Sequence, residues 1–202
     1  MKMNAEQNRN VEQAIDDLCE NLVWARAYLM VLKALHMVAK SSPASLEPYP
    51  QFVSCLYHGM FDCLFIKMHN FFDLSKGACG FPHLFKLLRR YVSENSQLMA
   101  QVAMDDDRLK GHVSTETIKI WRNEISAHLT QSYRCTDFFS SNSLHLSELE
   151  TLLNLVGETV ESYSFKMLGR INDTANPSAD IAEEIERLFW LRTEPSGAPD
   201  RR

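Results

Sequence analysis

The sequence places an arginine and a histidine six positions apart, in the segment WRNEISAH at residues 121–128. An imidazole has an unperturbed pKa of about 6.5, so His128 can accept or donate a proton near neutral pH. A guanidinium stays charged and can bind a phosphate through two N–H groups at once, which suits Arg122 to hold a phosphate group and the charge that grows on it. These two residue types together fit acid–base work on a phosphate ester.

Helical geometry decides how this pair can act. The segment carries an apolar stripe, and His128 lies about 60° to one side of it and Arg122 about 60° to the other; the stripe consists of Ile118, Trp121, Ile125 and Leu129. The two residues lie about 9 Å apart along an ideal helix, so they form no tight pair on one straight helix. A shared phosphate site needs the long reach of the arginine, an irregular helix, or the same pair from a second protomer. The last option fits a dimer with its seam along this helix.

Structural roles compete with these catalytic ones. His128 is alternatively a core histidine with satisfied hydrogen bonds, and Arg122 an ion-pairing residue. Asn123 projects roughly opposite the stripe, so it serves either as a weak substrate contact or as a hydrogen-bonding partner for a neighbouring helix.

A second set of polar residues shares one face of an otherwise apolar segment. The members fall within about 60° of one another on a helix; they are Gln51, His58, Asp62, His69 and Asp73. His58/Asp62 and His69/Asp73 have the i, i+4 spacing that can bind a metal or orient an imidazole. The two pairs are too far apart to ligate one ion, and no metal site is predicted. The set is either the wet face of a buried helix, or His69 and Asp73 line the same cleft as Arg122 and His128.

Basic charge is concentrated in one acid-free stretch between Asp73 and Glu94. Lys86, Arg89 and Arg90 share one side of the predicted helix, which is either a binding surface for a phosphate backbone or a solvated face. The whole chain has 21 basic and 26 acidic residues and a net charge of −5, which argues against a protein that coats nucleic acid.

The composition predicts one soluble, cytoplasmic domain made of long elements. Among 202 residues there are only seven glycines and seven prolines, while 45% are hydrophobic. We find neither a membrane span nor a signal sequence. The five cysteines form no CxxC pair, and Cys19, Cys55 and Cys63 are expected to be small core residues.

Apolar periodicity predicts an all-α helical bundle. A first helix runs from residue 11 to residues 41–43, and further helices are expected at 51–74, 81–91, 115–131 and 147–168, with a short one at 179–191. The apolar helix 51–74 is expected at the centre of the bundle. The segment 97–113 is ambiguous, and Asp105–Asp107 is expected to be a solvated acidic turn. Residues 1–170 would form the bundle, 171–192 a helical appendage and 193–202 a disordered tail.

The chain resembles the HEPN superfamily, in its branch linked to bacterial abortive infection. The mark of that superfamily is an arginine, usually followed by a polar residue, and a histidine after a gap of four to six residues; here Arg122-Asn123-x4-His128 has a gap of five. The segment KMHNFFD at 67–73, a Ser-Lys turn and a leucine-rich third helix add to the likeness, which covers residues 11–163. It implies an up-and-down bundle of four to five helices that commonly dimerises, and the apolar periodicity makes the two N-terminal helices the long ones.

The resemblance also implies a function. Many HEPN proteins are metal-independent endoribonucleases in which the arginine and histidine of two protomers meet in a cleft, while others keep the fold without catalysis. We therefore expect a cofactor-free toxin or antiphage protein that cleaves RNA at Arg122 and His128, as a homodimer and with an antitoxin as a further candidate partner. The alternative is a catalytically silent module that binds a nucleotide or a partner protein. A metal-dependent hydrolase ranks last, because the Glu-x-x-His pairs of di-iron bundles are lacking.

Overall fold

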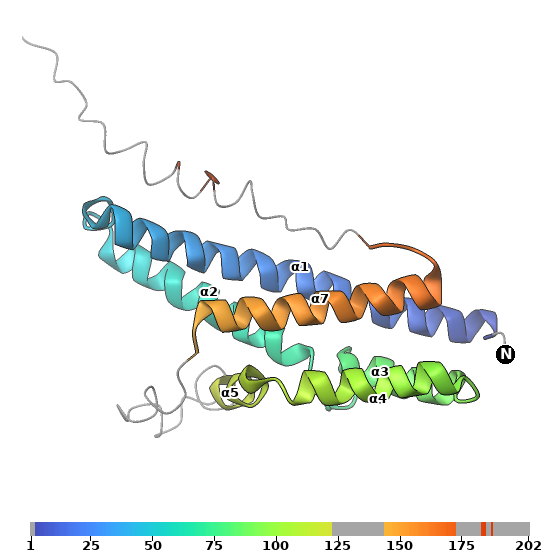
Figure 1. The fold of residues 1–202 in the computed structure, drawn as a ribbon. Helices are drawn as coiled ribbons and strands as arrows, with labels where there is room; N and C mark the ends of the chain where they lie inside the picture. Colours follow the sequence, from blue (N-terminus) through green and yellow to red (C-terminus); the bar gives the residue numbers. More distant parts are fainter. Residues whose placement is uncertain (1–2, 123–143, 173–182, 185–186, 188–202) are drawn as a thin grey trace, which may run out of the picture.

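A computed structural model of the chain describes residues 3–122, 144–172, 183–184 and 187. Within these residues there are six α-helices, one short 3-10 helix and no strand. The predicted all-α fold is therefore confirmed. The helices form two layers, with α1, α2 and α7 in one and α3, α4 and α5 in the other (Figure 1).

The two long N-terminal helices are α1 (Ala5–Ser41) and α2 (Pro50–Asn70), joined through the 3-10 turn η1 (Pro43–Ser45). Helix α1 begins before its apolar pattern does, because Asn4 and Gln7 form a capping box: the Asn4 side chain accepts from the Gln7 backbone N–H at 2.9 Å, and the Gln7 side chain accepts from the Asn4 N–H at 3.0 Å. A polar N-terminal stretch thus becomes the first turns of the longest helix.

Helix α1, and not α2, lies at the centre of the bundle. It packs against α2, α3 (Phe81–Tyr91) and α7 (Leu146–Leu168), whereas α2 packs against α1 and α5. In α2 only Leu64, Phe65 and Met68 are buried. The expectation that the apolar helix 51–74 is central was wrong, because apolar composition does not determine how many neighbours cover a helix, and the N-terminal part of α2 leaves Phe52 61% exposed.

The ambiguous segment is helix α4 (Ser96–Lys110), which begins where the Asn95 side chain accepts from the backbone N–H of Leu98. The expected solvated turn at 105–107 is therefore incorrect. Asp105 is only 6% exposed, and its carboxylate accepts hydrogen bonds from the Tyr163 hydroxyl at 2.9 Å and from the Gln101 amide at 3.0 Å. A buried carboxylate requires such partners, and one of them comes from a distant helix.

Helix α5 (Val113–Trp121) contains the start of the predicted helix 115–131; Arg122 follows α5, and residues 123–131 lie outside the described residues. Helix α7 agrees with the prediction for 147–168 and ends at Gly169, with φ at +67°. The appendage at 171–192 and the tail at 193–202 lie almost wholly outside the described residues, apart from 171–172, 183–184 and 187.

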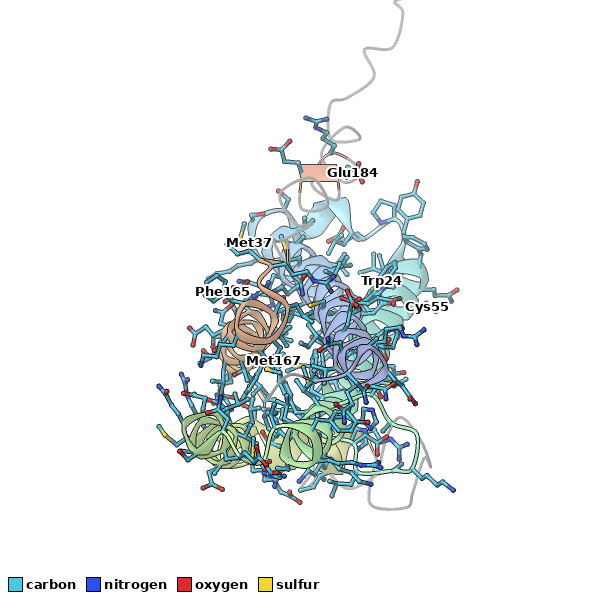
Figure 2. The ribbon with its side chains drawn as sticks, turned by 90° about the vertical axis from the view of Figure 1, so that its right-hand side faces the viewer. Trp24, Met37, Cys55, Phe165, Met167 and Glu184 are labelled. Carbon is cyan, nitrogen blue, oxygen red and sulfur yellow. The ribbon has the colours of Figure 1, made fainter. Side chains whose placement is uncertain are left out.

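The exposure of the cysteines differs from the prediction. Cys55 is exposed and is not a core residue, whereas Cys19 and Cys63 are half-buried; Figure 2 shows Cys55 and Trp24 on the α1–α2 side of the molecule.

By length and composition, α1 would pass as a membrane-crossing helix. However, 44% of its most apolar window is buried in the bundle, and the core helix of a soluble protein passes the same test.

Candidate functional site

An aromatic contact fixes the end of α5 against α2. The Trp121 ring lies 5.3 Å from the Phe65 ring, nearly parallel at 24°, and 5.3 Å from the Phe61 ring at 72°. Ile118, one turn earlier, is fully buried. This part of the predicted stripe therefore faces the core, and Arg122, the next residue after Trp121, is held half-buried beside α2.

His69 lies one helical turn beyond Phe65, in the last turn of α2. Burial lowers the pKa of His69 below its usual value, and the charges of Arg122 and Lys119 lower it further, while Asp73 opposes them. The imidazole is therefore predominantly neutral at neutral pH. The two cations on α5 and at its end thus act on a histidine of α2.

Asp73 belongs to the same neighbourhood. Hydrogen bonds from the Ser75 side chain and backbone lower the pKa of Asp73; burial acts to raise it, and the charges of His69 and Arg122 add smaller lowering effects. Arg122, His69 and Asp73 come from three different segments, and the fold brings them within electrostatic range of one another. The predicted cleft also included His128, which lies outside the described residues, so this proximity concerns Arg122 alone.

The turn between α2 and α3 holds Asp73 in place. The backbone N–H of Ser75 donates to the Asp73 carboxylate at 2.8 Å, and the N–H of Phe81 donates to the carbonyl of Phe71 at 2.9 Å, which closes the loop. Gly80 permits this closure, because a Cβ there would lie 2.4 Å from the carbonyl oxygen of Asn70. The carboxylate is therefore positioned by backbone geometry.

Two hollows adjoin this turn. One, of 360 Å³, lies between α1, the end of α2 and the turn; Asp17, Glu20, Lys67 and Asp73 are among its lining residues. The other, of 170 Å³, lies between the turn, the start of α3, the end of α4 and α5, with Lys110 and Lys119 in its wall. Among the charged lining residues, acids outnumber cations in the first hollow and cations outnumber acids in the second.

The other predicted residues divide into two groups. Gln51, His58 and Asp62 are exposed on α2, whereas the charge of Arg122 acts on His69 and Asp73 of that face. Asn123 and His128 lie outside the described residues. No group of three or more His, Cys, Asp or Glu side chains among the residues that are described is placed to hold a metal ion.

The basic strip on α3 is exposed as expected, but it is not a uniform cationic surface. Arg89 pairs with Asp106 of α4 at 2.9 Å, and Asp106 pairs in turn with Lys110 at 2.8 Å. Burial acts to raise the pKa of Asp106, but the hydrogen bonds from Lys110 and Arg89 outweigh it and hold the pKa below its usual range. The charge of Arg89 is thus shared with a carboxylate from another helix.

Sequence reasoning did not single out Lys119. It lies three residues before Arg122, a spacing that makes two helical side chains neighbours, and its charge acts on His69. That spacing was the available signal. Lys119 also forms an ion pair with Glu116 at 3.2 Å, in which the glutamate side chain is 74% exposed.

No curated protein and no solved structure matches the chain significantly. One family model does match, and it spans residues 9–187, which include the described helices α2, α3, α4, α5 and α7 and nearly all of α1. That match contains Arg122, His128 and the His69–Asp73 turn. The chain therefore belongs to the HEPN_AbiU2 (AbiU2) family, a HEPN-type abortive-infection family.

Proposed function

We propose that this protein is a metal-independent endoribonuclease of abortive infection, acting as a toxin in antiphage defence. The observation that carries the proposal is the placement of Arg122 beside a neutral His69 and a fixed Asp73 in a chain of this family. A cation that directly follows a packed tryptophan in the chain and lies beside oriented polar groups suits the binding of a phosphodiester.

The proposed reaction is transesterification of RNA. The 2′-oxygen of a ribose attacks the adjacent phosphorus while its proton passes to a base, and the bond from phosphorus to the 5′-oxygen breaks as that oxygen takes up a proton. The products are a 2′,3′-cyclic phosphate and a 5′-hydroxyl. His128 would move the protons, and Arg122 would bind the non-bridging oxygens of the phosphate.

His69 and Asp73 act as positioning residues in this proposal. A neutral imidazole beside Arg122 carries no negative charge, so it does not compete with the phosphate for the guanidinium. It can donate or accept one hydrogen bond. The Asp73 carboxylate favours the guanidinium electrostatically and is itself held by Ser75. Together they would set the direction of Arg122, whereas Asn123 would contribute at most a weaker contact.

We further propose that the active form is a homodimer. On a straight helix Arg122 and His128 lie about 9 Å apart along the axis, and a dimer in which each copy supplies one residue gives a compact site without an irregular helix or an extended arginine. Large apolar side chains remain exposed on the α1–α2 side, including Trp24 at 47% and Ile66 at 46%. Exposed apolar surface of this kind supports association.

Cleavage of a fluorescent RNA in excess chelator tests the proposed activity directly. The wild-type protein should release fragments with cyclic-phosphate ends. We expect R122A to lose about 10²- to 10³-fold in rate and H128A about 10²- to 10⁴-fold. Arg90→Ala is the matched control, because Arg90 is exposed on α3.

Expression in bacteria gives an independent test. The wild-type gene should arrest growth, and R122A should relieve the arrest while the protein still folds. A folded protein that binds RNA without cleaving it would instead favour the catalytically silent binding module. If coexpression of a protein encoded by a neighbouring gene relieves the growth arrest, that protein is the proposed antitoxin partner in the cytoplasm.

A further inference from the structure

The 170 Å³ hollow beside α5 has a composition that suits one part of a nucleotide. Its apolar wall includes Phe72, Leu74 and Pro82, and its polar wall includes Lys110 and Lys119. Drug-sized ligands occupy pockets of about 300–1,000 Å³, so this hollow has room for a single flat ring system. Leu74 is 79% exposed at this place, a large apolar side chain that the bundle core does not use.

The cations of the hollow continue the charge of the proposed active site. Lys119 lies one helical turn before Arg122, and both act electrostatically on His69. Asp73 directly precedes Leu74 in the chain, and the charge of Arg122 lowers the pKa of Asp73. The hollow and the Arg122 site are therefore neighbours along one surface, joined through residues 69–74.

The ion pairs that these lysines form do not prevent them from binding a phosphate. Lys119 is 39% exposed and pairs with a glutamate that is 74% exposed, and Lys110 is 58% exposed. Solvent-exposed pairs of this kind are weak and exchange with other anions. Asp106 also lines the hollow, but two cations, Arg89 and Lys110, are bonded to its carboxylate.

We propose that this hollow is a nucleotide subsite: it holds the base that neighbours the scissile phosphate of a single-stranded RNA, while Lys110 and Lys119 bind the phosphate attached to that nucleotide. This inference rests on the proposed function, since it takes Arg122 to hold the scissile phosphate. Proteins bind single-stranded nucleic acid with positively charged grooves and with side chains against which the bases pack; here the lysines would supply the charge, and Leu74 and Pro82 the packing surface, because Phe72 and Phe81 are buried. The subsite would fix which bond of the RNA lies at Arg122.

The test measures the binding of a fluorescein-labelled 2′-O-methyl oligoribonucleotide by anisotropy over a range of salt concentrations. The methyl group removes the attacking hydroxyl, so binding is observed without cleavage. Three variants are compared: Lys119→Ala, Leu74→Ser and, as the matched control, Lys86→Ala on the exposed side of α3. All three side chains are partly or fully exposed, and thermal melting verifies that each variant folds.

Each variant has a distinct expected result. Lys119→Ala should weaken binding and reduce the slope of log affinity against log salt by about 0.7, the value for one phosphate contact of a single strand. Leu74→Ser should weaken binding by about tenfold, because the base loses the apolar side chain against which it packs, with the slope unchanged. Lys86→Ala should behave as the wild type.

The outcomes separate this inference from the proposed function. If the wild type cleaves and binds RNA while Lys119→Ala and Leu74→Ser bind as well as the wild type, the subsite is wrong and the nuclease proposal stands. If Lys86→Ala alone weakens binding, the α3 strip binds the RNA and the subsite is equally overturned. If the wild type neither binds nor cleaves single-stranded RNA, both proposals fall.

Discussion

Trp121 of α5 stacks on Phe65 of α2, with ring centroids 5.3 Å apart and the ring planes inclined by 24°. The residues that follow each ring in its helix are those of the candidate site: Arg122 comes directly after Trp121, and His69 comes one turn after Phe65. A hydrophobic contact thus sets the relative position of a cation and an imidazole that lie 53 positions apart in the sequence.

Trp121→Ala should lower both stability and activity. Removal of a nearly buried tryptophan costs about 3–5 kcal/mol of unfolding free energy, and Arg122 would lose its fixed position beside His69. Trp121→Phe keeps an aromatic ring against Phe61 and Phe65 and should retain much of the activity. Chemical denaturation measures the stability and RNA cleavage the activity; equal activities in the folded forms of both variants would contradict this role of the stacking contact.

Gly80→Ala should distort the turn that carries Asp73. The added Cβ would lie 2.4 Å from the carbonyl oxygen of Asn70 and 2.8 Å from that of Phe71, and backbone must move to relieve both contacts. We expect a loss of about 1–3 kcal/mol and slower RNA cleavage.

Gly59→Ala is the matched control for this prediction. Gly59 lies within α2, and a Cβ there meets nothing within 4 Å. This change should raise stability by about 0.5–1 kcal/mol, because alanine favours a helix over glycine. A thermal melt in which Gly80→Ala is as stable as Gly59→Ala would show that the turn tolerates a side chain.

Tyr163→Phe should destabilise the protein through Asp105. The phenol donates to a buried carboxylate at 2.9 Å, and burial together with that carboxylate raises the pKa of Tyr163. Loss of a hydrogen bond to a charged group costs about 1.5–3 kcal/mol. Tyr91→Phe removes a neutral, half-buried bond from Asn10 at 3.2 Å and should cost less, about 0.5–1.5 kcal/mol. Urea denaturation of the two variants compares them; equal losses would mean that the buried carboxylate adds nothing.

Stability should fall as the pH is lowered from 7.5 to 5.5. Burial lowers the pKa of both His69 and His112 below 6.5. At His69 the charges of Arg122 and Lys119 lower the pKa further and Asp73 opposes them. At His112 the charge of Glu148 opposes the effect of burial. The unfolded chain therefore takes up protons first. The contribution of the neutral imidazoles to the free energy of unfolding is fully present above about pH 6.5. It is lost as the pH falls through the lower pKa values that the two histidines have in the folded state.

His112 gives this pH effect a structural cause. Its Nδ1 accepts from the backbone N–H of Ser114 at 3.3 Å and caps α5, which a protonated ring cannot do. The double variant His69→Gln/His112→Asn should show a flatter stability profile over this range, since asparagine retains the capping function. Unfolding midpoints at several pH values measure it, and an unchanged profile would assign the pH dependence to other groups.

Much of the fold could be predicted from apolar periodicity. The helices at 81–91 and 147–168 agree with the structure within a residue, because the spacing of apolar residues reports which side of a helix is buried. The boundary at Ala5 depended on capping chemistry, and the helical state of Asp105–Asp107 depended on Tyr163, a partner 58 residues away. Local charge density cannot reveal such a partner.

The candidate site was partly predictable for the same reason. Helical geometry put His69 and Asp73 on one face and offered a cleft shared with Arg122 and His128, of which His128 lies outside the described residues. The same face included His58 and Asp62, which the structure leaves exposed on α2. Lys119 was missed, since its relevance depends on the approach of α5 to the end of α2. Nothing in the pattern of a single helix specifies that approach.

The sequence by itself determined that the chain is a helical bundle and that Arg122 and His128 carry the mark of its family. Only the tertiary structure decided that α1 and not α2 is central, that Asp105 is a buried acceptor, and that Lys119 and His69 adjoin Arg122. The physical reason is that periodicity divides one helix into apolar and polar sides. Burial and electrostatic neighbours depend instead on which other helices pack there, as the stacking of Trp121 on Phe65 does for Arg122.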